Sequence, residues 1–139
     1  LGVQAYDFFA DMETLIAASD IVVCMGGYNT LCEILSSRTM SLVIPRETPR
    51  KEQCIRALAF NRRSLIEFIP WSQLTELNLE EKILTMLENK TGYESAMNDF
   101  EMTGIEMICE RIANFWNGKN GKECKPDTLC RTERVSKNI

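Results

Sequence analysis

Residues 21–45 read IVVCMGGYNTLCEILSSRTMSLVIP, and this stretch decides the fold. Residues 21–24 are apolar and mostly β-branched, which is typical of a strand buried on both faces in a parallel sheet. The glycine pair at 26–27 interrupts the run, and residues 28–37 then carry apolar side chains at helical spacing. A second buried-type strand follows at 41–44. The stretch therefore predicts a strand–helix–strand unit with parallel strands.

The same alternation of strands and helices continues on both sides of this unit. We expect a strand at 2–6, a helix capped by Asp11, a helix from Pro49 to Arg63, an edge strand at 65–69, a helix capped by Asn78 that ends at 88, helical residues at 94–102 and a helix at 104–116. This order predicts an α/β fold, with a Rossmann-like parallel sheet and helices on both faces.

Length and composition favour a single globular domain. The chain has 139 residues with 45% hydrophobic and 26% charged residues, and its net charge of -4 does not favour nucleic-acid binding. We expect residues 1–117 to form the domain and the polar residues 118–139 to form a disordered tail. Because the chain opens at Leu1, inside an α/β unit, we expect it to be a fragment of a longer protein.

The six cysteines suggest a reducing compartment. Four of them, Cys24, Cys32, Cys54 and Cys109, lie in apolar periodic segments, where a free thiol acts as a small hydrophobic group. There is no CxxC pair and no histidine, so we expect no metal site. No signal peptide or run long enough to span a bilayer is visible, and we expect a cytoplasmic location.

Three loops are expected at the carboxyl edge of the sheet, where open α/β sheets bind their ligands. They comprise residues 6–11, 25–29 and 46–51. In the middle loop, the glycine pair allows close approach of a ligand, and the following helix directs free N–H groups at it. Asn29 and Thr30 add donors, and the Glu33 carboxylate can accept hydrogen bonds from ribose hydroxyls. A diphosphate is the ligand that this loop favours.

Each loop also has a plainer interpretation. The glycine pair is neither a GxGxxG motif nor a P-loop and can be a simple turn, and Glu33 can serve the helix dipole. In the third loop Arg46, Arg50 and Lys51 place positive charge near a diphosphate, and Glu52 and Gln53 can bind sugar hydroxyls. That loop can equally be a solvated surface loop. Phe8 and Phe9 of the first loop can offer a surface to a nucleobase or simply belong to the core.

Together these motifs resemble the C-terminal domain of family 28 glycosyltransferases, over about Val3 to Ala113. The order of the FFADM segment, the GGYNT segment and the segment IPRETPRKEQ is that family's order. The middle segment is most similar to a subgroup of predicted bacterial glycosyltransferases with GGYNT. The resemblance implies the C-terminal half of a GT-B fold, which transfers a sugar from a UDP-sugar without a bound metal or other cofactor.

The resemblance also implies roles for individual residues. Phe9, through its backbone, and Met12 match the uracil-binding loop. Glu33 matches the ribose-binding carboxylate, and Glu52 and Gln53 match the pair that binds the donor sugar. The residues that match the diphosphate-binding turn are Gly26, Gly27, Asn29 and Thr30.

The family's peptidoglycan enzyme has arginine where this chain has Met25, and glutamine where it has Glu52. Arg46 or Arg50 is our candidate for the missing charge. We nominate no catalytic residue, because the general base and the acceptor site of a GT-B enzyme lie largely in an N-terminal domain. We therefore expect the donor-binding half of a hexosyltransferase, inactive alone, whose donor sugar is N-acetylglucosamine or a related hexose.

Two other functions remain open. One is a UDP-sugar epimerase or hydrolase of the same fold. The other is a non-catalytic donor-binding subunit that needs a partner chain, docked through Ile105, Ile108, Ile112 and Phe115 of the last helix. Packing of those residues on their own sheet is the interpretation we prefer. The expected partners are the nucleotide sugar and an N-terminal acceptor domain or partner subunit, with no nucleic acid and with peripheral membrane association of the full-length enzyme.

Overall fold

The computed structural model describes residues 2–120, without the side chains of residues 118–120. Its contacts divide the chain into two compact units, Leu1–Phe100 and Glu101–Ile139. The predicted tail at 118–139 lies largely outside the described residues, and the predicted boundary at 117 stays a prediction. The two units are described separately below.

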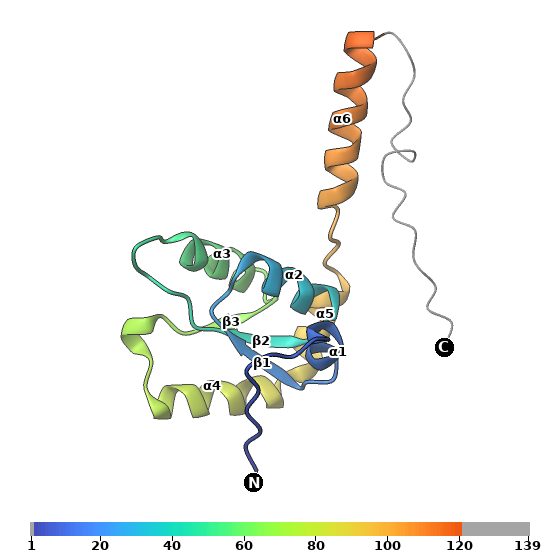
Figure 1. Cartoon of the computed structure of the whole chain (residues 1–139). Helices are drawn as coiled ribbons and strands as arrows, with labels where there is room; N and C mark the ends of the chain where they lie inside the picture. The colour runs from blue at the N-terminus through green and yellow to red at the C-terminus, as the bar shows by residue number, and fades with distance from the viewer. Residues whose placement is uncertain (1, 121–139) are drawn as a thin grey trace, which may run out of the picture. The chain divides into compact units, whose positions relative to one another are not determined.

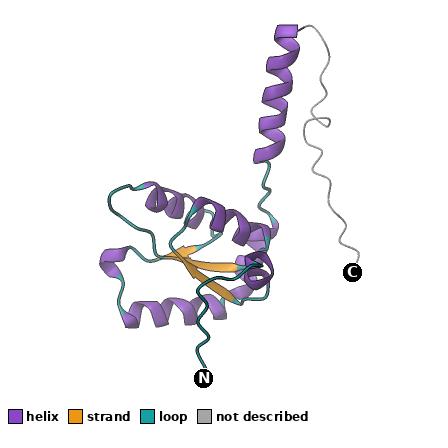
Figure 2. Ribbon diagram, in the orientation of Figure 1, coloured by secondary structure: helices purple, strands orange, loops and turns teal. Residues whose placement is uncertain are grey.

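The first unit is built on a three-stranded parallel sheet in the order β1 (Ile21–Cys24), β2 (Met40–Val43) and β3 (Glu67–Phe68) (Figure 2). The central strand β2 is buried at every position, as the sequence predicts. β1 differs from the prediction, because Val23 is 48% exposed. Since β1 is an edge strand of the described sheet, it is covered less completely than β2.

Helices cover both faces of this sheet. In Figure 1, α2 (Tyr28–Ser36) and α3 (Glu52–Asn61) lie on one face, and α4 (Glu76–Glu88) lies on the other. The short helix α1 (Met12–Ala17) packs on α2, and α5 (Lys90–Asn98) contacts β2. A 3-10 turn, η1 (Trp71–Gln73), follows β3. The predicted Rossmann-like arrangement is confirmed.

The core lies between the sheet and these helices. Leu31, Ile34 and Leu35 project from α2 at helical spacing and are buried together with the apolar residues of β2. Burying each such side chain stabilises the fold by about 1.5–3 kcal/mol relative to leaving it exposed. The same apolar residues that predict α2 from their spacing therefore also pack α2, and with it the turn before α2, against the sheet.

Some predicted boundaries are wrong. Residues 2–6 form no strand, because they pair with no described strand. The helix expected from Pro49 begins only at Glu52, since the Gln53 side chain in its first turn accepts a hydrogen bond from the backbone N–H of Arg46 and extends the preceding loop. α4 begins at Glu76, and its cap is Thr75, whose hydroxyl oxygen accepts from the N–H of Asn78.

The last two helices also differ from their predicted bounds. α5 covers Lys90–Asn98 rather than 94–102. The second unit contains α6 (Gly104–Asn120), longer than predicted, on which Ile105, Ile108, Ile112 and Phe115 have exposed fractions between 49% and 63%. No described helix is both long and apolar enough to cross a membrane.

The cysteines agree with the prediction only in part. Cys24, Cys32 and Cys54 are free thiols, as expected. Cys109 is disulfide-bonded, which the sequence interpretation did not expect. Cysteine usage therefore no longer supports the prediction of a reducing, cytoplasmic location.

Candidate functional site

The fold itself requires a glycine at position 26, the first of the two glycines in the turn between β1 and α2. Gly26 is buried and has a φ of 75°, a conformation that other residues adopt only with strain. A Cβ on Gly26 would also lie 2.7 Å from Cγ1 of Val43 in the central strand. Gly26 is therefore needed to let the chain leave β1 against the neighbouring strand.

Gly27 has no such structural requirement. It is the N-cap of α2, its φ of -56° and ψ of 147° suit any residue, and an added Cβ would meet only the Thr30 hydroxyl oxygen, at 3.7 Å. What Gly27 does provide is open space above the start of α2. A ligand could therefore come closer to the backbone here than beside any residue with a side chain.

The start of α2 has free hydrogen-bond donors. No side chain caps it, which is also true of α3 and α5, whereas Asp11 caps α1 and Thr75 caps α4. The first backbone N–H groups of a helix have no acceptor within the helix, and the helix dipole adds partial positive charge at this end. The beginning of α2 can therefore bind an anion such as a phosphate group.

The predicted polar residues of α2 lie in its first two turns. Asn29 and Thr30 are in its first turn, Asn29 exposed and Thr30 half-buried. Glu33 lies about one turn further along and is exposed. Among the described residues, no hydrogen bond or ion pair occupies its carboxylate. It is available to accept hydrogen bonds from a ligand.

The loop between β2 and α3 is fastened to the first turn of α3. Oε1 of Gln53 accepts from the backbone N–H of Arg46 at 2.9 Å, and the Cys54 thiol contacts the carbonyl oxygen of Arg46 at 3.6 Å. Oε1 of Gln53 already accepts one hydrogen bond, and its amide NH2 is available as a donor to a ligand. Glu52 is the first residue of α3 and is exposed, and so are the side chains of Arg46 and Arg50.

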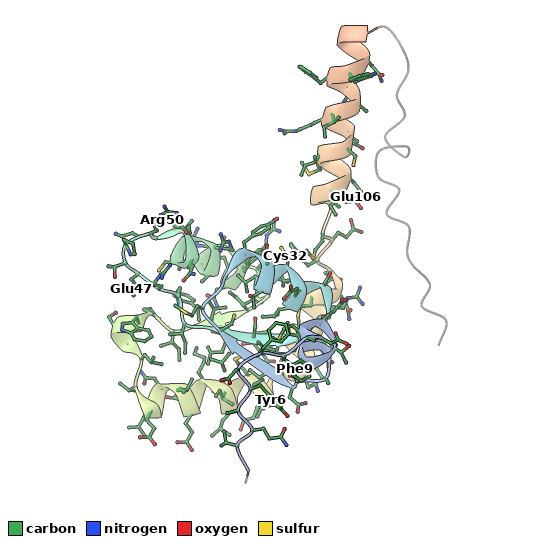
Figure 3. All side chains as sticks on the ribbon, in the orientation of Figure 1. Tyr6, Phe9, Cys32, Glu47, Arg50 and Glu106 are labelled. Atoms are coloured by element: carbon green, nitrogen blue, oxygen red, sulfur yellow. The ribbon has the colours of Figure 1, made fainter. Side chains whose placement is uncertain are left out.

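The predicted base-binding loop lies apart from this second loop. Phe9 is half-buried and its ring meets the ring of Tyr6 edge-on, with centroids 5.6 Å apart. Met12 is the first residue of α1 and is 44% exposed. Figure 3 shows Phe9 beside α1, well separated from Glu47 and Arg50 on the loop between β2 and α3. The residues predicted to bind the diphosphate lie together at the start of α2, while Phe9 lies at some distance from Glu47 and Arg50.

Arg56 contacts the glycine turn, and the sequence interpretation did not include it among the candidate residues. Its Nη1 donates to the carbonyl oxygen of Gly26 at 2.8 Å, and its guanidinium lies 5.6 Å from the centre of the Tyr28 ring. Arg56 therefore joins α3 to the glycine turn. Its position was a usable signal, because it follows Glu52 by four residues and Gln53 by three, and so shares their side of the helix.

A pocket of about 290 Å³ beside the turn was also missed. It is lined by Met25, Arg46, Glu47, Thr48 and Trp71. Trp71 comes from η1, 46 residues after Met25 in the sequence, so no local pattern could have indicated it. Met25 directly precedes the glycine pair, and this places the pocket next to the predicted diphosphate site.

A second pocket, of about 390 Å³, lies elsewhere, between the end of β3 and α4. Its lining includes Phe68, Gln73 and Lys82 but no residue of the three predicted loops. Near it, Glu67 accepts a hydrogen bond from the Tyr93 hydroxyl at 2.7 Å and pairs with Lys82 at 3.3 Å. These contacts join β3 to α4 and α5, so we interpret this polar group as structural.

The groups around the turn are suited to binding rather than to nucleophilic chemistry. Burial raises the pKa of the Cys24 thiol, while a hydrogen bond from the backbone of Gly26 lowers it to a smaller extent. Cys24 therefore stays protonated at neutral pH and is a poor nucleophile. Among residues 2–120 there is no group of three His, Cys, Asp or Glu side chains that could hold a metal ion.

Comparison with known proteins supports the same interpretation. Residues 1–112 match the family described as the glycosyltransferase family 28 C-terminal domain. This range contains all three predicted ligand loops. The likeness to the GGYNT subgroup stays a prediction.

Curated relatives match a large part of the chain. The UDP-N-acetylglucosamine--N-acetylmuramyl-(pentapeptide) pyrophosphoryl-undecaprenol N-acetylglucosamine transferases of Streptococcus pneumoniae strains JJA and Hungary19A-6 are each 34% identical to it over 94 residues. The match covers 66% of this chain and 27% of each relative. The chain thus spans about a quarter of the length of these relatives.

Proposed function

The chain belongs to the glycosyltransferase family 28 C-terminal domain family, and on this premise we propose that it binds the UDP-sugar donor of a glycosyltransferase. The transferred sugar in this proposal is N-acetylglucosamine or a related hexose. The named relatives support this choice, because their name gives UDP-N-acetylglucosamine as the donor.

The observation that carries the proposal is the start of α2, which no side chain caps and which follows Gly27, a glycine that the fold does not require. The Gly27 backbone leaves room for a diphosphate, and the N–H groups of the first turn of α2 are its donors. When the bond to the sugar breaks, negative charge grows on the departing UDP. Donors already in place stabilise that charge without reorganising, and this is how the chain would lower the barrier to transfer.

The remaining predicted residues surround this centre. Glu33 accepts hydrogen bonds from the ribose, and its exposed carboxylate supports that role. The uracil lies by the backbone of Phe9 and by Met12, beyond the ribose. The sugar lies towards Glu52 and the amide of Gln53, next to the pocket that contains Trp71. No bound metal or other cofactor has a part in this proposal.

Catalysis needs groups from outside this chain. We place the acceptor and the general base in an N-terminal domain of the full-length protein or in a partner subunit, since the relatives are several times longer than their match to this chain. The 139-residue chain then binds the donor but does not transfer the sugar. A cytoplasmic location with peripheral membrane association belongs to the same proposal.

Isothermal titration calorimetry of the 139-residue chain tests donor binding. We expect UDP and UDP-N-acetylglucosamine to bind about tenfold or more tightly than ADP, since one well-made hydrogen-bond difference is worth about 1.5 kcal/mol. Equal binding of UDP and ADP would refute uridine recognition while leaving phosphate binding. No heat with any of the three nucleotides would refute the donor-site proposal.

A further inference from the structure

Arg56 makes two contacts with the turn that the proposed function places under the diphosphate. Nη1 donates to the Gly26 carbonyl at 2.8 Å, across 30 residues of sequence, in a part-buried position. The guanidinium also lies over the ring of Tyr28, the first residue of α2, at 5.6 Å. One side chain of α3 therefore holds both the turn and the beginning of α2.

We propose that Arg56 is a positioning residue that orients the start of α2 towards the donor diphosphate and places positive charge behind the glycine turn, across the Gly26–Gly27 peptide from the diphosphate. This inference rests on the proposed function. In this inference Arg56, rather than Arg46 or Arg50, replaces the positive charge that is missing at Met25.

The first part of the argument concerns the peptide unit between Gly26 and Gly27. A trans peptide is planar, so its N–H points away from its C=O. Because the Arg56 guanidinium binds the Gly26 carbonyl, the Gly27 N–H points away from that guanidinium. A charged donor on the carbonyl also polarises the peptide and makes its N–H a stronger donor.

The hydrogen-bond partners of the neighbouring N–H groups agree with this orientation. The Gly26 backbone hydrogen-bonds with the Cys24 thiol, and its carbonyl is taken by Arg56. Gly27 accepts at its carbonyl from the N–H of Leu31, which is the first bond of α2. No described residue accepts a hydrogen bond from the Gly27 N–H, and that donor is left for a ligand.

The second part of the argument concerns charge. Arg56 is half-buried and forms no ion pair with a described residue. No described carboxylate therefore neutralises the positive charge of Arg56. This charge lies next to the turn, where the uncharged side chain of Met25 supplies no positive charge. The side chains of Arg46 and Arg50 are exposed and make no hydrogen bond or ion pair with the turn among the described residues.

The test compares Arg56→Met with a matched control, Arg63→Met. Arg63 also places its guanidinium over an aromatic ring, that of Phe100 at 5.7 Å, but it does not touch the turn. Binding of UDP and of uridine is measured by NMR titration of the 139-residue chain, with circular dichroism as a check of folding. Comparing the two ligands separates recognition of the phosphates from recognition of the nucleoside.

We expect Arg56→Met to weaken UDP binding by about tenfold or more while changing uridine binding less than about twofold, as loss of a charge-assisted contact requires. Arg63→Met should leave both unchanged. Arg56→Lys keeps a charge and a donor, and should restore UDP binding to within about fivefold of wild type. Should Arg56→Met fail to fold, Arg56→Gln replaces it, with the same selective loss expected.

Two results would overturn the assignment alone. They are unchanged UDP binding in the Arg56 variants, or an equal loss of UDP and uridine binding, which indicates a purely structural role. If wild-type protein does not bind UDP, the proposed function itself fails and takes this inference with it. The wild-type titration thus distinguishes the two failures.

Discussion

Replacing each glycine of the turn by alanine separates the needs of the fold from the needs of the ligand. Gly26→Ala places a methyl group 2.7 Å from Cγ1 of Val43, at a residue whose φ is 75°. The strained backbone costs about 1–2 kcal/mol and overpacking about 1–3 kcal/mol. Their sum is roughly 2–5 kcal/mol of unfolding free energy, which lowers Tm on the order of 10–25 °C for a domain of this size.

Gly27→Ala should behave in the opposite way. Its φ of -56° suits alanine and the nearest atom to the new Cβ is 3.7 Å away, at the Thr30 hydroxyl. The poorer N-cap and the stiffer unfolded chain nearly cancel, so we expect stability to change by less than about 0.5 kcal/mol. The methyl group would nevertheless occupy the space proposed for the diphosphate. Losing one charge-assisted hydrogen bond there costs about 1.5–3 kcal/mol, or about 10- to 150-fold in Kd for UDP.

The assay is thermal unfolding of both variants followed by calorimetric titration of UDP into each one that is folded at 25 °C. The reasoning predicts a stable Gly27→Ala protein with weak UDP binding and an unstable Gly26→Ala protein. Wild-type UDP affinity in Gly27→Ala would show that no ligand approaches the turn closely. A large loss of stability in Gly27→Ala would show that the packing argument is wrong.

Three further predictions concern other parts of the molecule. In parallel titrations, Glu33→Gln should weaken the binding of UDP by about tenfold and the binding of 2′-deoxy-UDP by about twofold, because only the ribose has the second hydroxyl to bind. Equal losses of affinity for the two ligands would count against ribose binding. Trp71→Ala should weaken the binding of UDP-N-acetylglucosamine by about fivefold and leave the binding of UDP unchanged, since Trp71 lines the pocket on the sugar side. Weaker binding of both ligands would place the sugar elsewhere. Burial raises the pKa of Tyr93, and the hydrogen bond to Glu67 and the negative charge of Glu67 raise it further. The stabilisation that Tyr93 provides is therefore complete below its unfolded pKa of about 10 and is lost as pH rises through its folded pKa. Tyr93→Phe should lower Tm by about 4–8 °C at pH 7 and should reduce the fall in Tm above about pH 10. An unchanged dependence of Tm on pH would refute this.

Local pattern was sufficient for the elements around the site. The β-branched run at Ile21–Cys24 predicted β1, and the apolar spacing from Leu31 to Leu35 predicted α2. Both signals are local, because a buried strand and an amphipathic helix are each recorded in consecutive residues. The turn between them, with its glycines and free N–H groups, was therefore predictable as well.

Contacts between residues far apart in sequence were not predictable in this way. The bond from Arg56 to Gly26 spans 30 residues, and the pocket next to Met25 is completed by Trp71. The start of α3 was placed too early for a similar reason, since it depends on the side chain of Gln53 reaching back to Arg46. Val23 is more exposed than its apolar character suggested, because exposure depends on which strands lie beside β1.

The most direct test of the central claim is an NMR titration of the 15N-labelled chain with UDP, read at single backbone amides. The account predicts that the largest shifts fall on Gly27, Tyr28, Asn29 and Thr30, the turn and the first turn of α2. Largest shifts at residues 68–85, around the pocket beside α4, would contradict it, as would a spectrum that UDP leaves unchanged.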